Sequence, residues 1–270
     1  MIRSSGAYLG GRSGIYPVGG GSNTDPDAQA VIDQMTSNGS TPSAGRQTLI
    51  NQLVLDLKGI GNTGSDDIWS LLDILNIHAA EDAIQAQTQW INADGTYDSV
   101  QVGTPTFTAD LGFSSTTVSN RIDPVWVPTT ALGNYTLNNA SVGFYGVVVN
   151  AGYFLADSSV GNIIMRGSTG FNYEAAMNSA FIANSGDWGS LDNLFILDRN
   201  SSANFNKYTG TTLIQTNVKT STSLTSNQIR YPYAFSGGGT QTAKIVFFGA
   251  SVRGSLTQLK DSFDAYLAGL

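Results

Sequence analysis

Three apolar stretches decide the fold: Ser141-Val142-Gly143-Phe144-Tyr145-Gly146-Val147-Val148-Val149, Asn193-Leu194-Phe195-Ile196-Leu197 and Lys244-Ile245-Val246-Phe247-Phe248-Gly249-Ala250. They are short, rich in β-branched and aromatic residues, and bounded by turn-forming residues, which is the pattern of β-strands. Shorter runs of the same kind lie at 99–102, 106–109, 161–165, 213–215 and 229–231. Because no helical pattern separates these runs, we expect a mainly β protein built as a two-sheet antiparallel sandwich.

Helical patterns flank the predicted strands on both sides. Asp25-Pro26-Asp27 is typical of a helix start, because Asp can cap and Pro suits the first helical position, and Gly39 ends this pattern. Apolar residues recur at intervals of three and four over 41–59 and again over 256–267. Two further short helices are predicted over 66–75 and 79–90. We expect the C-terminal helix to pack on the sandwich or on a neighbouring subunit.

These patterns divide the chain into three parts. Residues 1–24 form a Gly-rich arm, expected to be flexible because glycine loses the most backbone entropy on ordering. Residues 25–91 are a helical region for attachment or oligomerisation, and residues 92–270 are the sandwich with its C-terminal helix. A helix with one apolar stripe must bury it, and a three-fold bundle or a virion partner can do so, which leads us to expect a homotrimer. The arm's candidate docking residues are Tyr8, Leu9, Ile15 and Tyr16.

Composition and charge exclude several classes of function. The 270 residues include no cysteine, which excludes disulfides and thiolate chemistry. Lys and Arg number 13 against 20 Asp and Glu, so the formal net charge is −7 and a nucleic-acid partner is disfavoured. No apolar run approaches the roughly 18 residues of a membrane span, so we expect no membrane insertion.

Catalytic groups are scarce. His78 is the single histidine, lies among apolar neighbours and has no Gly-x-Ser-x-Gly element beside it, so a packing or capping role is favoured. A jelly-roll glycosidase needs two carboxylates on one sheet face, whereas the two glutamates, Glu81 and Glu174, are far apart in the chain. We therefore predict a protein that is not an enzyme.

No cofactor is expected from the residues. Calcium is the one metal worth considering, since loop carboxylates and carbonyls are its usual ligands. None of the candidate aspartates has the alternating spacing of a calcium loop, so a role in surface turns is favoured for each. These aspartates are Asp123, Asp157, Asp187, Asp192 and Asp198.

Aromatic side chains in loop-like places suggest a glycan site. A sugar ring can stack on an aromatic face while neighbouring polar groups bind its hydroxyls. Trp188 beside Asp187, and Tyr231 with Tyr233 around Pro232, have this composition. The alternative is that such aromatics belong to the core, with Trp188 capping one edge of the sandwich.

Several stretches resemble structural proteins of tailed bacteriophages that carry a concanavalin A-like, or laminin-G-like, jelly-roll domain. The resemblance covers most of residues 25–270, and its motifs form the fold and carry no chemistry. The segment Arg121–Pro128 departs from it, because a bulkier stretch replaces a Gly-rich one. The stretches that carry the resemblance are Asp25–Ala30, Leu71–Leu75, Gly103–Phe113, Tyr135–Gly143, Asp198–Ser202 and Ala243–Ala250.

This resemblance implies a virion protein that assembles in the host cytoplasm with other virion structural proteins. A tail-associated fibre or tip component that contacts a host-surface glycan is the first interpretation. Two alternatives stay open: a capsid decoration or head-fibre protein anchored by its N-terminal arm, and, more weakly, a tail-spike polysaccharide depolymerase.

Overall fold

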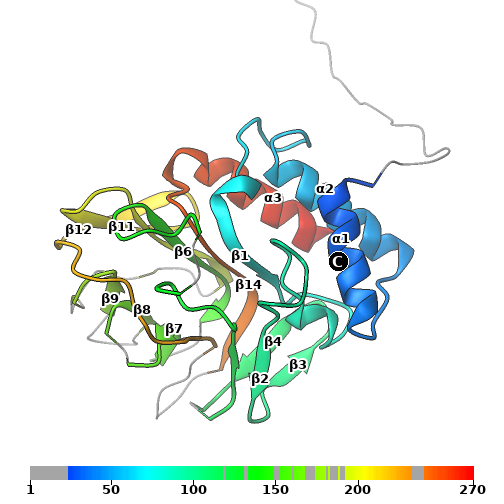
Figure 1. Ribbon diagram of the computed structural model, residues 1–270, viewed down its shortest axis with the longest axis horizontal. Coiled ribbons are helices and arrows are strands. Elements are labelled where there is room, and N and C mark those ends of the chain that lie inside the picture. The colour runs from blue at the N-terminus through cyan, green and yellow to red at the C-terminus, as the bar shows by residue number, and fades with distance from the viewer. Residues whose placement is uncertain are drawn as a thin grey trace, which may run out of the picture.

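Two antiparallel sheets face each other in the computed structural model, and α-helices cover the outer face of the larger sheet (Figure 1). The structure describes residues 24–117, 119–130, 133–148, 152–159, 161–167, 174–180, 182, 188, 192–232 and 240–270. The predicted mainly β, jelly-roll-like sandwich with a C-terminal helix is confirmed. No helix in these ranges is long and apolar enough to cross a membrane.

Eight of the described strands form the larger sheet, in the order β12-β11-β10-β6-β14-β4-β3, with β1 also paired to β14. Their bounds are β1 (Leu72–Ile77), β3 (Thr106–Thr108), β4 (Gly112–Ser115), β6 (Ala140–Val148), β10 (Asp192–Arg199), β11 (Asn204–Thr209), β12 (Thr212–Val218) and β14 (Gln241–Gly249). The smaller sheet has the order β13 (Ile229–Arg230), β7 (Gly152–Asp157), β8 (Ile163–Gly167), β9 (Glu174–Met177). A separate pair joins β2 (Val100–Val102) to β5 (Arg121–Asp123).

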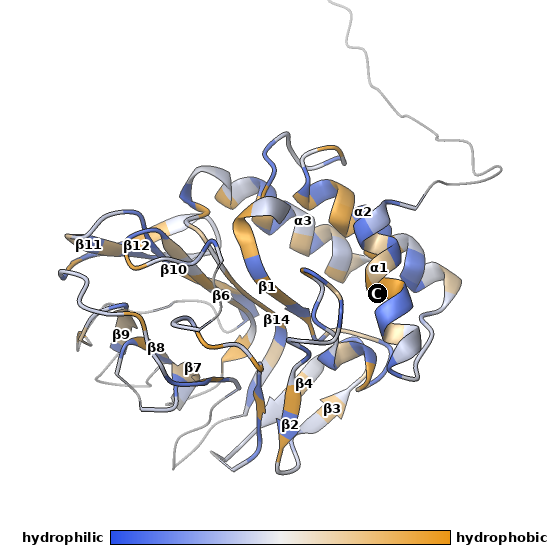
Figure 2. Ribbon diagram, viewed as in Figure 1, coloured by the Kyte–Doolittle hydropathy of each residue, from blue (hydrophilic) through white to orange (hydrophobic). Residues whose placement is uncertain are grey.

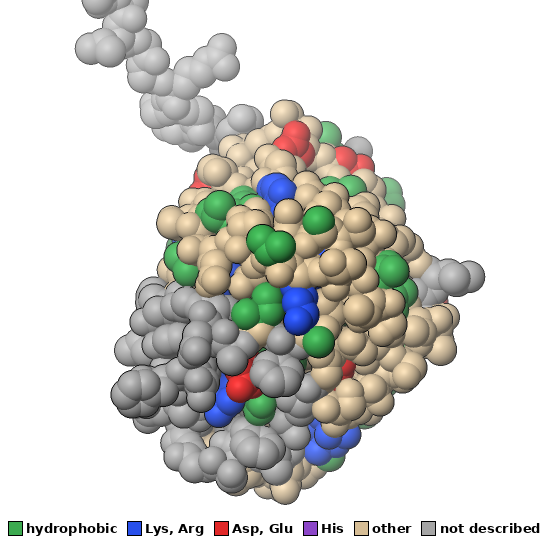
Figure 3. All heavy atoms as spheres, turned by 90° about the vertical axis from the view of Figure 1, so that its left-hand side faces the viewer, with side chains coloured by type: hydrophobic (Ala, Val, Ile, Leu, Met, Phe, Trp, Pro, Cys, Tyr) green, Lys and Arg blue, Asp and Glu red, His purple; other side chains and the backbone are tan. Residues whose placement is uncertain are grey.

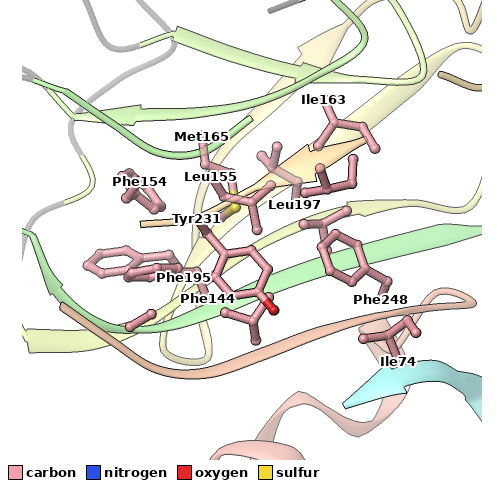
Figure 4. Close-up of a cluster of buried hydrophobic side chains, with 14 of the residues drawn as sticks. Ile74, Phe144, Phe154, Leu155, Ile163, Met165, Phe195, Leu197, Tyr231 and Phe248 are labelled. Carbon is pink, nitrogen blue, oxygen red and sulfur yellow. The ribbon is translucent and has the colours of Figure 1, made fainter. Parts of the chain in front are cut away.

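The central strands of the larger sheet are buried on both faces. Phe195 on β10 and Phe248 on β14 lie between the two sheets, whereas their neighbours Ile196 and Phe247 lie under the helices. Successive side chains of a strand point to opposite faces, so a strand covered on both sides is a continuous apolar run. Figure 2 shows the hydrophobic colour along β6 and β14, and Figure 4 shows the cluster of buried aromatic and aliphatic side chains between the sheets.

Among the described residues, three α-helices form the layer over the larger sheet: α1 (Pro26–Ser37), α2 (Ala44–Leu57) and α3 (Leu256–Ala268). As predicted, Asp25 caps α1 by accepting the N–H of Asp27 at 2.9 Å. The apolar stripes of α1 and α2 are buried against α3 and the sheet. These stripes are therefore covered within one chain, which removes the uncovered apolar face on which the prediction of a three-fold bundle was based.

The two short helices predicted over 66–75 and 79–90 are also wrong. Residues 72–77 form β1, which pairs antiparallel with β14, and the described helical turns nearby are only the 3-10 turns Trp69–Leu71 and Gln85–Gln87. Because β1 is buried on both faces, its apolar residues adjoin one another and imitate a helical stripe. The helical character predicted for residues 25–91 therefore ends at Leu57, and Trp90 shares a core cluster with Ile245 of the sandwich.

Candidate functional site

Trp188 is a core residue. Only 3% of it is exposed, and its indole Nε1 donates a hydrogen bond to the Arg166 carbonyl at 2.9 Å. Its ring meets Phe154 and Phe195 edge-on, and Lys207 Nζ lies 4.1 Å from the ring centroid. The interpretation of Trp188 as a platform for a sugar ring is therefore wrong, because its faces are already covered by the fold.

Tyr231 is likewise buried between the sheets, among the side chains labelled in Figure 4. Its hydroxyl bonds to Asn76 Oδ1 at 3.0 Å, and burial raises the pKa of this hydroxyl well above its ordinary value. It cannot stack on a ligand, so this part of the predicted glycan site is also wrong. The remaining predicted site residues, Asp187, Tyr233, Tyr8, Leu9, Ile15 and Tyr16, lie outside the described residues.

His78 fills the interior, in the role that the sequence favours. It is fully buried, its ring lies 5.5 Å from that of Phe113 and 5.3 Å from that of Tyr231, and Nδ1 is 2.6 Å from the Ala86 carbonyl. A carbonyl oxygen only accepts, so Nδ1 carries the proton of the neutral ring. Burial lowers the pKa of His78 to about 4.

The candidate carboxylates that the structure describes act within the fold. Asp157 accepts the N–H groups of Gly161 and Asn162, both at 2.9 Å, and so closes the turn before β8. Glu174 pairs with Arg166, with Nη1 2.7 Å from Oε1. Asp123, Asp192 and Asp198 form ion pairs with Arg121, Lys244 and Arg253. No cluster of three His, Asp or Glu suited to a metal occurs in the described part of the chain.

One groove, of about 440 Å³, lies at the start of α2 and has Arg46, Glu81 and Asp110 among its lining residues. Arg46 is 6% exposed, donates to the Ala79 carbonyl at 2.8 Å and pairs with Asp110. Burial opposes ionisation of Glu81, but hydrogen bonds from Ser43 and Gln85 lower its pKa overall. Arg46 and Glu81 therefore hold the start of α2 against the loop that contains Ala79 and Glu81.

A smaller hollow, which we call the hydroxyl hollow, lies beside β3, β4 and the start of β14. Its volume is about 280 Å³, and every residue that lines it has a hydroxyl or an amide side chain: Thr104, Thr106, Ser114, Ser115, Thr116, Asn120 and Thr240. None of them is charged. Such a surface offers several hydrogen-bond donors and acceptors at once, which is what a polyhydroxylated ligand requires.

Strand register and one glycine shape the hydroxyl hollow. Thr106 and Ser114 stand directly opposite each other on β3 and β4, so their side chains share a face of the sheet. Asn120 Oδ1 accepts the Thr104 N–H at 2.9 Å and holds the rim. Gly103 has φ +70°, and a Cβ there would lie 2.3 Å from the Ser119 carbonyl oxygen, so the rim requires glycine.

The sequence did not single out the hydroxyl hollow. Serine and threonine are ordinary strand residues, and the lining residues come from three separate segments that only the strand pairing brings together. One signal was available: Thr104, Thr106 and Thr108 alternate with Pro105 and Phe107, which places the hydroxyls on one side of an edge strand.

Comparison with known proteins shows the fold. No protein-family model matches the chain, and no curated protein matches it. Among solved structures, the botulinum neurotoxin serotype D binding domain matches with a TM-score of 0.53 at 9% identity, over 74% of this chain and 53% of that one. The receptor-binding domain of the C/D mosaic serotype matches with a TM-score of 0.51 at 8% identity, over 75% and 51%.

A third match is the serotype D ligand-binding domain in complex with N-acetylneuraminic acid, with a TM-score of 0.50 at 10% identity. It covers 73% of this chain and 51% of that one, so this chain spans about half the length of the toxin domains that it matches. At such identities the likeness establishes a shared β-sandwich architecture.

Proposed function

We propose that this chain is a non-enzymatic structural protein of a bacteriophage particle, a tail-associated fibre or tip component whose β-sandwich contacts a host-surface glycan. The hydroxyl hollow carries the glycan part of the proposal, because hydroxyl and amide side chains line it throughout. The sandwich architecture supports it, since a toxin domain of the same architecture is found in complex with a sugar acid. The resemblance of the motifs to tailed-phage proteins supports the virion part.

A sugar held in the hydroxyl hollow would lie against the exposed edge of the larger sheet. Thr104, Thr106 and Thr116 are exposed, so their hydroxyls are open to a ligand from solvent. Each hydrogen bond between neutral partners contributes about 0.5–1.5 kcal/mol, so a few of them give weak binding per site. Display of many copies on one particle would raise the overall avidity.

The test is binding of the full chain to a glycan array and to host cells, with variants of the hollow. Thr106→Val combined with Ser114→Ala removes two hydroxyls and little volume, and should weaken binding about tenfold or more. Thr108→Val is the matched control, because Thr108 lies on the same strand, is also exposed and does not line the hollow. Binding to no glycan and no cell, or equal loss in the control, would refute the glycan part.

Location on the particle is tested separately by labelling the chain and imaging intact virions. Label on the tail supports a fibre or tip component. Label on the head would replace this proposal with a capsid decoration protein.

A further inference from the structure

The outer edge of β12 is the most exposed apolar segment of the larger sheet. In the described part of the chain, β12 pairs with β11 on one side and with no strand on the other. Three of its seven residues are large, exposed hydrophobics: Leu213 is 50% exposed, Ile214 37% and Val218 84%. Figure 3 looks onto the side of the molecule where β11 and β12 lie in Figure 1, and shows hydrophobic side chains there on a surface with few charges.

Natural edge strands are protected by charges, proline or shortness, because an open edge offers unpaired backbone N–H and C=O groups to another strand. The sequence of β12, Thr-Leu-Ile-Gln-Thr-Asn-Val, has no charge and no proline. By contrast, the strand at the opposite edge, β3, is three residues long. A bulge at Ile214 bends the first half of β12, but Gln215–Val218 keeps a regular register with β11.

The order of residues along β12 is complementary to itself. After Thr212, the apolar residues Leu213 and Ile214 lie toward the start and Val218 at the finish, with polar residues between them. An antiparallel partner related by a two-fold axis sets the start of one strand against the finish of the other. Apolar ends then meet apolar ends, and amide and hydroxyl side chains meet in the middle.

Charge also permits a second copy at this edge. The chain as a whole is acidic, with a formal net charge of −7, so two copies repel, and carboxylates facing each other at the contact would add to this repulsion. Residues 199–230, which include β11 and β12, contain no Asp and no Glu. Two chains can therefore pair through β12 without opposing carboxylates across the contact.

We propose that β12 pairs antiparallel with β12 of a second copy, so that two larger sheets join into one continuous sheet across a two-fold axis. The interface is distinct from the hydroxyl hollow, because β12 and β3 lie at opposite ends of the strand order. Glycan binding and dimerisation can therefore fail independently of each other. A dimer would present two hydroxyl hollows at the far ends of the joined sheet.

Light scattering during size-exclusion chromatography of the full chain tests the proposal. We expect a dimer at micromolar concentration, with Val218→Lys weakening dimerisation at least tenfold. Val125→Lys is the matched control, because Val125 is a 48% exposed apolar residue outside β12, and it should leave the dimer intact. Since Val218 is 84% exposed, the fold should survive the change, which circular dichroism can verify. A wild-type monomer, or an oligomer that Val218→Lys leaves intact, would overturn the proposal.

Cysteine cross-linking gives a second readout, because the natural chain has no cysteine. Thr216→Cys places one thiol near the proposed two-fold axis, and oxidation should give a covalent dimer in high yield. Thr108→Cys, on the opposite edge, should stay monomeric on a denaturing gel. Cross-linking of Thr108→Cys in preference to Thr216→Cys would assign the contact to the other edge and refute the pairing through β12.

Discussion

Acid should destabilise the protein through His78. The ring is fully buried, its Nδ1 proton is held by the Ala86 carbonyl, and Nε2 has no hydrogen-bond partner among the described residues. A second proton would therefore place a charge against the rings of Phe113 and Tyr231 with no acceptor. The folded state resists this, so the pKa of His78 falls from 6.5 to about 4.

The sign and size of the effect follow from proton linkage. Between pH 6.5 and 4 the unfolded chain binds a proton that the folded chain does not, so the free energy of unfolding falls as the pH falls through this window. The full contribution is present above pH 6.5 and is lost by about pH 4. A pKa difference of this size corresponds to about 3 kcal/mol at most.

The assay is urea unfolding at a series of pH values, for the wild type and for His78→Gln. Gln cannot titrate and can still donate to the Ala86 carbonyl, so the variant should lose less stability on acidification. The aspartates are the same in both proteins, so the difference between the two isolates the contribution of His78. A difference that stays constant from pH 7 to pH 4 would refute a buried, neutral His78.

Three further changes test other parts of the structure. Gln241→Met should raise the free energy of unfolding, measured by urea titration, by about 1 kcal/mol. The Gln241 side chain is fully buried, and neither amide atom has a hydrogen-bond partner in the described structure. A clear loss of stability would show that the amide is bonded. Arg199→Met should lower the free energy of unfolding by about 3 kcal/mol, because the buried guanidinium donates to the carbonyls of Met177 at 3.0 Å and Lys219 at 3.1 Å. A loss below about 1 kcal/mol in the same titration would contradict this. Gly103→Ala should lower both the melting temperature and glycan binding, because the φ of +70° and the nearby Ser119 carbonyl leave no place for a Cβ. If neither changes, the rim of the hydroxyl hollow does not require glycine at this position.

Local sequence patterns predicted the three α-helices and the long central strands. α1, α2 and α3 each bury one stripe at a helical spacing, whereas β6, β10 and β14 are apolar runs with aromatic and β-branched residues, a composition that indicates a strand without any alternation. β1 is also buried on both faces, but it contains no aromatic residue, and Leu71, Leu72 and Leu75 fit a helical spacing, so its sequence was misread as a helix. Only its pairing with β14, about 170 residues later, decides between the two.

The candidate site was less predictable than the fold. Trp188 and Tyr231 stand beside turn-forming residues in the sequence, which suggested exposed loops, yet the sandwich buries both. Burial depends on which strands face one another, and a single sequence does not state this. The hydroxyl hollow has the same origin, because residues 104, 114 and 240 become neighbours only through the register of β3, β4 and β14.

The pairing of β1 with β14 has a consequence for synthesis of the chain. In Figure 1 the cyan strand β1 lies beside the orange strand β14, and α2 lies beside the red helix α3. While a ribosome makes the chain, residues 26–91 emerge long before the partners that cover their apolar surface. Contacts of such sequence separation slow folding and leave a nascent chain open to aggregation. A ribosome stalled before residue 241 would therefore hold an incomplete core.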